Sequence, residues 1–171
     1  MQYENVIFPD SVTFHCRKCG SCCRDQPPDI NFKEQRRIEA AGYKNFMQNQ
    51  SDKKNRNIRK NKDGRCFFFE EESNLCKINS IKPSICALEP FIITNFDCAT
   101  KKIFLSLNPA ATANCKGIFT AENVNLEEIA KAAQNMVKDF SEIISEKTGL
   151  SVTDEKVALL TMKLLKDLNS K

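Results

Sequence analysis

Hydrophobic residues at helical spacing dominate the C-terminal third of the chain. From Leu126 to Ile144 apolar residues recur at every third or fourth position, and a similar stripe begins near residue 153 after a break at Gly149. This spacing predicts two amphipathic helices joined as a hairpin. The hairpin must bury its apolar stripe, either on the rest of the chain or against a second copy in a homodimer.

Shorter apolar runs in the middle of the chain predict two β-hairpins. The first pairs RCFFFE (65–70) with LCKI (75–78), and the second pairs FIITNF (91–96) with KIFLSL (102–107). β-branched and aromatic residues are enriched in these runs, as is typical of strands. Residues 6–14 carry a similar pattern and predict an extended segment before the first cysteines.

One further helix is predicted near the N-terminus. Asn31 and Glu34 form a capping box at its start, and Gly42 suits the position after its end. A short second helix is expected over residues 43–47. Residues 51–63 hold one apolar residue without any period and predict an exposed loop.

These elements together predict an α+β fold. A chain of 171 residues suits one compact domain, or a small core with an appendage. We expect a Cys-rich metal-binding domain with short β-hairpins over residues 1–119. Residues 120–171 would form the C-terminal helical hairpin packed on it.

The amino-acid composition limits the classes of protein to which the chain can belong. The apolar share of 41%, with twelve Phe, is enough for a core. No apolar run approaches the roughly 20 residues of a membrane span, and the start lacks the apolar segment of a secretory signal. We therefore expect a cytoplasmic location, where thiols stay reduced unless a metal takes them.

Four of the nine cysteines lie within eight residues, at Cys16, Cys19, Cys22 and Cys23. A C-x-x-C spacing lets one tight turn present two sulfurs to one metal, and Gly20 supplies the positive φ that such a turn needs. Cys23 directly follows Cys22, so either the backbone bends sharply or Cys23 serves a second centre. Polar neighbours argue against simple burial, and an odd count argues against a disulfide framework.

The other cysteines are widely spaced, at Cys66, Cys76, Cys86, Cys98 and Cys115. Cys98 falls in the loop of the second hairpin and is interpreted as a plain loop thiol. The remaining four, added to the first four, fit two tetrathiolate centres or one cluster plus a zinc ion.

Four sequence blocks now resemble a known family. They are Phe14-x-Cys16-x-x-Cys19-Gly20-x-Cys22-Cys23, Gly64-Arg65-Cys66-Phe67-Phe68-Phe69, Cys76-x-Ile78-x-x-Ile81-Lys82-Pro83-x-x-Cys86 and Cys115-x-Gly117. In these blocks the chain resembles the CxxCxxCC cysteine-cluster family, a group of zinc- or iron-chelating domains often labelled Fe–S oxidoreductases. The family usually has Arg at the positions of Lys82 and Ala87.

The resemblance covers residues 12–118 and implies a set of ligands. The implied ligands of the metal or cofactor are Cys16, Cys19, Cys22, Cys23, Cys66, Cys76, Cys86 and Cys115. Cys98 has no counterpart in the family pattern. Flagellin lysine N-methylases, which are much longer, carry a similar segment and are thought to bind a [4Fe–4S] cluster.

Thiolate ligands suit both zinc and iron–sulfur centres. The run C-x-x-C-x-x-C resembles ferredoxin spacing and favours a [4Fe–4S] cluster. The predicted function is then electron transfer or cluster-dependent redox or modification chemistry, with a redox partner or a protein substrate. The sequence leaves open whether the chain is an enzyme.

The alternative is a zinc-stabilised adaptor module with a basic loop for an acidic partner or RNA. The basic residues of this loop are Lys53, Lys54, Arg56, Arg59, Lys60 and Lys62. The loop lacks aromatic residues for stacking bases, so a solvated loop is the simpler interpretation. A third alternative, ranked last, is that the protein stores or carries metal. A single His and the absence of an H-E-x-x-H motif argue against conventional hydrolysis.

Overall fold

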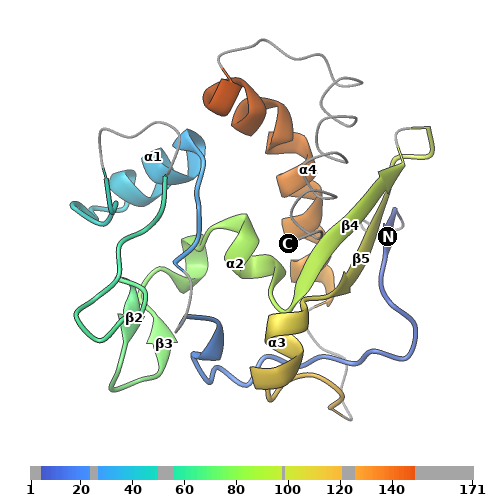
Figure 1. Ribbon diagram of the computed structural model, residues 1–171, viewed down its shortest axis with the longest axis horizontal. Helices are drawn as coiled ribbons and strands as arrows, with labels where there is room; N and C mark the ends of the chain where they lie inside the picture. Colours follow the sequence, from blue (N-terminus) through green and yellow to red (C-terminus); the bar gives the residue numbers. More distant parts are fainter. Residues whose placement is uncertain (1–4, 24–26, 50–55, 98, 121–125, 149–171) are drawn as a thin grey trace.

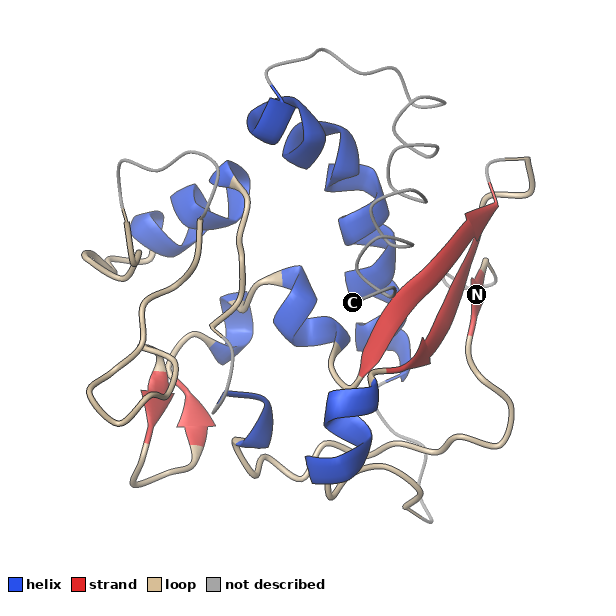
Figure 2. Cartoon of the chain, viewed as in Figure 1, coloured by secondary structure: helices blue, strands red, loops and turns tan. Residues whose placement is uncertain are grey.

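The computed structural model describes residues 5–23, 27–49, 56–97, 99–120 and 126–148, with side chains described only up to residue 139 in the last range. The helices are α1 (Phe32–Ala40), α2 (Ser84–Leu88), α3 (Pro109–Asn114) and α4 (Leu126–Thr148), with 3₁₀ turns at Ser21–Cys23 and Asn79–Ile81. The strands are β1 (Val6–Ile7), β2 (Phe69–Glu70), β3 (Leu75–Cys76), β4 (Phe91–Asp97) and β5 (Lys102–Leu107). The predicted α+β class is confirmed (Figure 2).

A three-stranded sheet lies on one side of the molecule (Figure 1). β4 and β5 form the predicted antiparallel hairpin, and β1 adds to β5 in parallel, with Val6 opposite Ile103. The strand order is β1-β5-β4. The extended segment expected before the first cysteines is therefore a strand at Val6–Ile7, and it forms one edge of this sheet.

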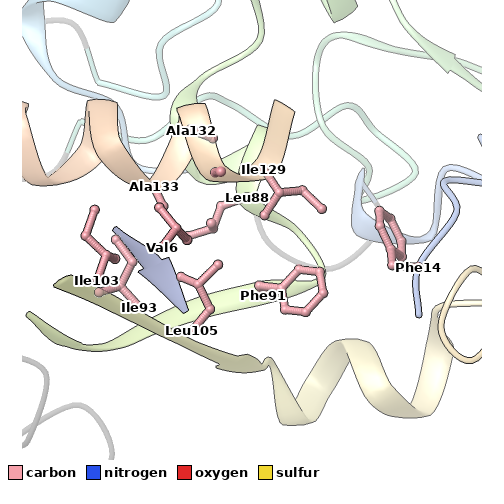
Figure 3. Close-up of a cluster of buried hydrophobic side chains, with 11 residues drawn as sticks. Val6, Phe14, Leu88, Phe91, Ile93, Ile103, Leu105, Ile129, Ala132 and Ala133 are labelled. Atoms are coloured by element: carbon pink, nitrogen blue, oxygen red, sulfur yellow. The ribbon is translucent and has the colours of Figure 1, made fainter. Parts of the chain in front are cut away.

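Helix α4 covers this sheet and packs against α2 and β1. Its residues Ile129, Ala130 and Ala133 are at most 1% exposed, and Figure 3 shows Ile129 and Ala133 facing the side chains of the sheet. The amide of Gln134 also donates a hydrogen bond of 2.7 Å to the side-chain oxygen of Asn5, just before β1. The predicted C-terminal stripe is thus confirmed over the described part of α4, while the second predicted helix lies outside the described residues.

A second hydrophobic cluster lies under α1 and the small hairpin β2–β3. Its buried members are Ile30, Ile38, Phe46, Met47, Ile58, Cys66, Phe68 and Ile78. The predicted capping box of α1 is present: the Glu34 N–H donates to Asn31 Oδ1 at 2.8 Å, and the Asn31 N–H donates to Glu34 Oε2 at 3.2 Å. Gly42, with φ of 93°, follows the end of α1 as predicted.

One local prediction is wrong and another is wrong in part. Residues 43–47 form no helix, because Asn45 adopts a left-handed φ of 56° and Met47 pairs with Ile58 in a β-bridge. The exposed loop predicted over residues 51–63 is wrong at residues 56–58, whereas residues 59–63 are exposed as predicted and residues 51–55 lie outside the described ranges. Arg56 is 4% and Ile58 1% exposed, so this part of the segment belongs to the second cluster.

Helix α3 was not among the predicted elements. Asn108 caps α3 by accepting from the Ala110 N–H at 3.1 Å, and Pro109 occupies the first helical position. An Asn-Pro pair before an Ala-rich run is a recognisable helix start. None of the helices in the described ranges is long and apolar enough to cross a membrane.

Candidate metal centre

Backbone pairing brings Cys115 to the first cysteine motif. Phe14 and Ile118 form an antiparallel bridge, and the His15 N–H donates to the Gly117 carbonyl at 2.9 Å. The Lys116 N–H in turn donates to the Cys19 sulfur. We call the thiols gathered here the first thiol group, namely Cys16, Cys19, Cys22 and Cys115.

The remaining thiols gather on the side of the small hairpin. The Cys66 N–H donates to the Cys23 carbonyl at 2.9 Å, and the Phe69 N–H donates to the Cys66 carbonyl at 2.9 Å. Phe69 is the register partner of Cys76 across β2–β3. Cys66 therefore lies just before β2, not on the strand as predicted. We call Cys23, Cys66, Cys76 and Cys86 the second thiol group; Cys98 lies outside the described residues.

The two thiol groups sit in different surroundings. Cys115 packs against the cluster of the sheet and α4, whereas Cys66 is a member of the cluster under α1 and Cys23 and Cys76 pack against it. Burial is the main cause that raises the pKa of Cys115, and negative charge on Cys19, Cys22 and Cys16 adds to it. Burial likewise raises the pKa of Cys86, and negative charge on Cys66, Cys22 and Cys76 adds to it. Negative charge on Cys22 raises the pKa of thiols in both groups, so Cys22 interacts electrostatically with both.

Backbone N–H groups are aimed at four of the sulfurs. In each case the donor lies two residues after the cysteine: Ser21 for Cys19, Phe68 for Cys66, Ile78 for Cys76 and Gly117 for Cys115. A hydrogen bond to sulfur stabilises the thiolate, which is the form that binds metal. Hydrogen bonds of this kind support and tune ligating thiolates in metal centres.

The pKa of each thiol depends on its burial and its hydrogen bonds. Burial raises the pKa of Cys66 and Cys76, and raises the pKa of Cys86 further. A hydrogen bond from the Cys23 thiol lowers the pKa of Cys22 to about 7, and the same bond raises the pKa of Cys23. Burial opposes the ionisation of Cys19, but hydrogen bonds from Ser21 outweigh it and lower the pKa.

Two charged residues, Lys82 and Glu89, act on Cys22, and the sequence predicted no role at the site for either of them. The Lys82 charge favours the thiolates of Cys22 and Cys76, whereas the Glu89 carboxylate disfavours the Cys22 thiolate. Burial raises the pKa of Glu89, which accepts a hydrogen bond of 3.1 Å from the Asn108 amide. Lys82 and Glu89 flank α2 in sequence, and this placement could have suggested them.

Two glycines allow close approach of the chain at this site. Gly20 has φ of 69°, as predicted, and a Cβ there would lie 2.3 Å from Cε2 of Phe69 in β2. At Gly117 a Cβ would lie 2.3 Å from the His15 carbonyl oxygen. The first contact holds the motif against the small hairpin, and the second holds it against the segment that carries Cys115.

The donor set fits a thiophilic metal. All eight cysteines in the described ranges are free, and none is tied in a disulfide. Within the same ranges no three Cys, His, Asp or Glu side chains converge as closely as ligands of one ion. To bind one ion, the sulfur atoms must therefore move closer together than they are here. Such movement is typical of sites that form only when the metal binds.

Comparison with known proteins identifies the family. The sequence profile of the CxxCxxCC family, described as “Putative zinc- or iron-chelating domain”, matches residues 15–116, more than half of the chain. The chain belongs to the CxxCxxCC family. It is also 26% identical over 149 residues to an uncharacterized protein of Methanocaldococcus jannaschii, a match that covers 82% of this chain and 78% of that protein. No solved structure matches the chain.

Membership in the CxxCxxCC family supports a metal-binding function for the Cys-rich part, with zinc or iron as the metal. The matched range contains all eight cysteines of the two thiol groups. Their role as ligands remains a prediction.

Proposed function

We propose that the first thiol group holds a [4Fe–4S] cluster and that the protein acts in electron transfer. The observation that carries this proposal is the pairing of the first motif with the segment 115–118, through the Phe14–Ile118 bridge and the bond from His15 N–H to Gly117 O. It supplies a remote fourth thiol, Cys115, to a C-x-x-C-x-x-C run. Three clustered cysteines and one remote cysteine are the ligand arrangement of ferredoxin-type clusters.

The number of thiols decides between two kinds of redox chemistry. Three cysteines would leave one iron open to a substrate, whereas four saturate the cluster and favour transfer of electrons to a partner protein. Cys16 and Cys22 are exposed, and they give electrons a short path to the surface. When bound, the cluster supplies one-electron redox chemistry, and the chain supplies the N–H donors and the Lys82 charge that tune it.

The alternative, a zinc-stabilised adaptor with a basic loop, is less well supported. Arg56 is buried with its guanidinium carbon 3.5 Å from the ring centroid of Phe32, and Arg59 lies 4.3 Å from that of Phe67. Arg56 therefore contributes to packing, whereas Arg59 stays exposed while it stacks on the ring. Lys53 and Lys54 lie outside the described residues. An acidic or RNA partner and a homodimer remain predictions.

Spectroscopy of protein purified without oxygen tests the proposal. We expect a brown protein with broad visible absorption that bleaches on reduction and contains iron and acid-labile sulfide in equal amounts. Cys115→Ser should lose most of this iron and sulfide, while Cys98→Ser should match the wild type. A colourless wild-type protein without sulfide, or a Cys115→Ser variant with an unchanged cluster, would contradict the proposal.

A further inference from the structure

The two segments that form the first thiol group carry positive charge and no carboxylate. Residues 11–23 and 109–120 contain Arg17, Lys18 and Lys116 but neither Asp nor Glu. The two segments are bonded to one another and run side by side next to α3 (Figure 1). The three basic residues therefore gather at the first thiol group, and we call them the cation cluster.

The cation cluster is exposed beside an exposed thiol. Arg17 directly follows Cys16, which is exposed, and the Lys116 N–H donates to the Cys19 sulfur. All three members of the cluster are exposed, and within the described ranges none of them has an ion-pair partner. Lys82, by contrast, is paired with a carboxylate of α4. The positive charge of the cation cluster is therefore available to another molecule.

An exposed aromatic side chain lies on the same segment as Lys116. Phe119 is 65% exposed, more than any other large apolar side chain in the described ranges. Its backbone has a left-handed φ of 58°, which is rare for a bulky residue, and its N–H donates to the Thr13 carbonyl at 2.8 Å. This bond holds Phe119 beside the segment that carries Cys16. Aromatic residues and Arg are enriched at protein interfaces, where they act as anchors.

An acidic turn lies on the side of the small hairpin. Glu70, Glu71 and Glu72 are exposed where β2 turns toward β3, and Figure 1 shows this hairpin apart from α3 and the segment after it. An acidic protein would be repelled by this turn and attracted by the cation cluster. The charges would thus orient such a protein toward the first thiol group.

We propose that the cation cluster and Phe119 form the docking surface for an acidic protein that exchanges electrons with the first thiol group. This inference rests on the proposed function and adds to it the class of the partner and the place where it binds. Charge complementarity selects the partner, and Phe119 supplies an apolar contact. The surface lies beside the exposed Cys16, so a docked partner can exchange one electron with the cluster held there, and no covalent bond forms or breaks.

Calorimetry with a protein probe tests the docking surface in the full-length chain. The probe is a plant-type [2Fe–2S] ferredoxin, used as a small acidic electron carrier, at low salt and without oxygen. We expect Arg17→Glu/Lys18→Glu/Lys116→Glu to weaken binding by more than about 30-fold, and Phe119→Ser to weaken it by about 10-fold. Binding to the wild type should also weaken steeply with added salt, because salt screens exposed charges.

The matched control is Lys44→Glu/Lys62→Glu/Lys131→Glu. It makes the same change in net charge at three exposed lysines outside the cation cluster, and it should weaken binding by less than about threefold. All of these variants should keep the wild-type content of iron and sulfide. A wild type that does not bind the probe, or a control that loses as much affinity as the cation-cluster variant, would overturn the docking surface.

The result is separable from the test of the proposed function. Calorimetry needs no reducible cluster, so binding that depends on the cation cluster in protein without iron and sulfide would support the surface and contradict only the [4Fe–4S] cluster. In reduced protein that carries iron and sulfide, ferricyanide, an anionic oxidant, should remove an electron at least about 10-fold faster from the wild type than from the cation-cluster variant. Hexaammineruthenium(III), a cationic oxidant, should react faster with the variant. Equal rates for wild type and variant with both oxidants would overturn the surface.

Discussion

At the scale of single residues, Gly117 decides whether Cys115 reaches the first motif. In Gly117→Ala the new Cβ would lie 2.3 Å from the His15 carbonyl oxygen and 3.0 Å from the Phe14 ring. Relieving this overlap separates the two segments, and we expect a loss of about 1–3 kcal/mol in the free energy of unfolding. Urea denaturation measures the loss, and the iron content should fall with it.

The neighbouring Lys116→Ala is the control for Gly117→Ala. The Lys116 side chain is exposed, and the variant keeps the backbone N–H that bonds Cys19. Its stability should stay within roughly 0.5 kcal/mol of the wild type. If Gly117→Ala and Lys116→Ala were equally stable, the close approach at Gly117 would not contribute to the stability of the fold.

The thiols also predict how the stability of the metal-free, reduced chain depends on pH. The pKa of Cys22 is lowered to about 7 from 9.0, so its contribution is present above pH 9 and is lost as pH falls through 7. The pKa of Cys86 is raised well above 9.0, so its contribution is present below pH 9 and is lost as pH rises above that value. The urea midpoint should therefore rise between pH 7 and 9 and fall beyond.

Variants separate these two contributions to the pH profile. Cys22→Ser should reduce the rise between pH 7 and 9, and Cys86→Ser should reduce the fall above pH 9, because each removes one of the thiols whose pKa shift acts in that window. A profile that neither variant changes would assign the pH dependence to other groups.

At the scale of elements, the carboxylate of Glu34 joins α1 to α2. It accepts from the Asn31 N–H at the start of α1 and, at 2.7 Å, from the Ser84 N–H at the start of α2. Glu34→Ala leaves both buried donors unsatisfied, and we expect a loss of about 2–3 kcal/mol in the free energy of unfolding. Because Cys86 lies two residues after Ser84, the loss should also move this thiol, and the total metal content of the purified protein should fall.

Two further variants serve as controls for Glu34→Ala. Glu34→Gln keeps an acceptor oxygen and should recover part of the stability. Glu39→Ala, on the same helix, removes an exposed side chain whose hydrogen bond is to Gln35, and should change stability by less than about 0.5 kcal/mol. Equal losses in Glu34→Ala and Glu39→Ala would contradict the linking role.

The elements that the sequence predicted correctly are those whose signal is local. The capping box of Asn31 and Glu34, the alternation in 91–107 and the stripe of α4 each lie within one segment. The parallel pairing of Val6 with Ile103 and the bridge from Phe14 to Ile118 join distant residues, and a single sequence holds no local signal for either. The assignment of thiols to two groups depends on such contacts, so it could not be predicted.

The wrong predictions have the same cause, namely contacts between residues that are distant in sequence. Residues 43–47 carry apolar side chains that fit a short helix, but Met47 pairs with Ile58 from a segment that is mostly polar. Tertiary pairing overrides local preference there. Arg56 was expected at the surface because it is charged, yet its guanidinium packs over the Phe32 ring.

At the scale of the whole molecule, the two hydrophobic clusters should depend differently on metal. The cluster of the sheet and α4 is closed by apolar side chains such as Phe91, Ile103 and Ile129. The cluster under α1 includes Cys66 and borders Cys23 and Cys76, so a metal bound by these thiols would be part of its packing. Removing metal under reducing conditions should loosen the second cluster first.

Amide hydrogen exchange measures this difference. In the metal-free chain, the amides of β5 and α4 should remain protected, while those of β2, β3 and residues 56–60 should exchange much faster than in the metal-bound chain. A uniform loss of protection across both clusters would mean that they unfold as one unit.

X-ray absorption at the iron edge of an anaerobic sample tests the central claim most directly, namely that thiols distant in sequence together hold an iron–sulfur cluster. The account predicts iron with both sulfur and iron neighbours. Iron without iron neighbours, or iron ligated by nitrogen or oxygen, would contradict it.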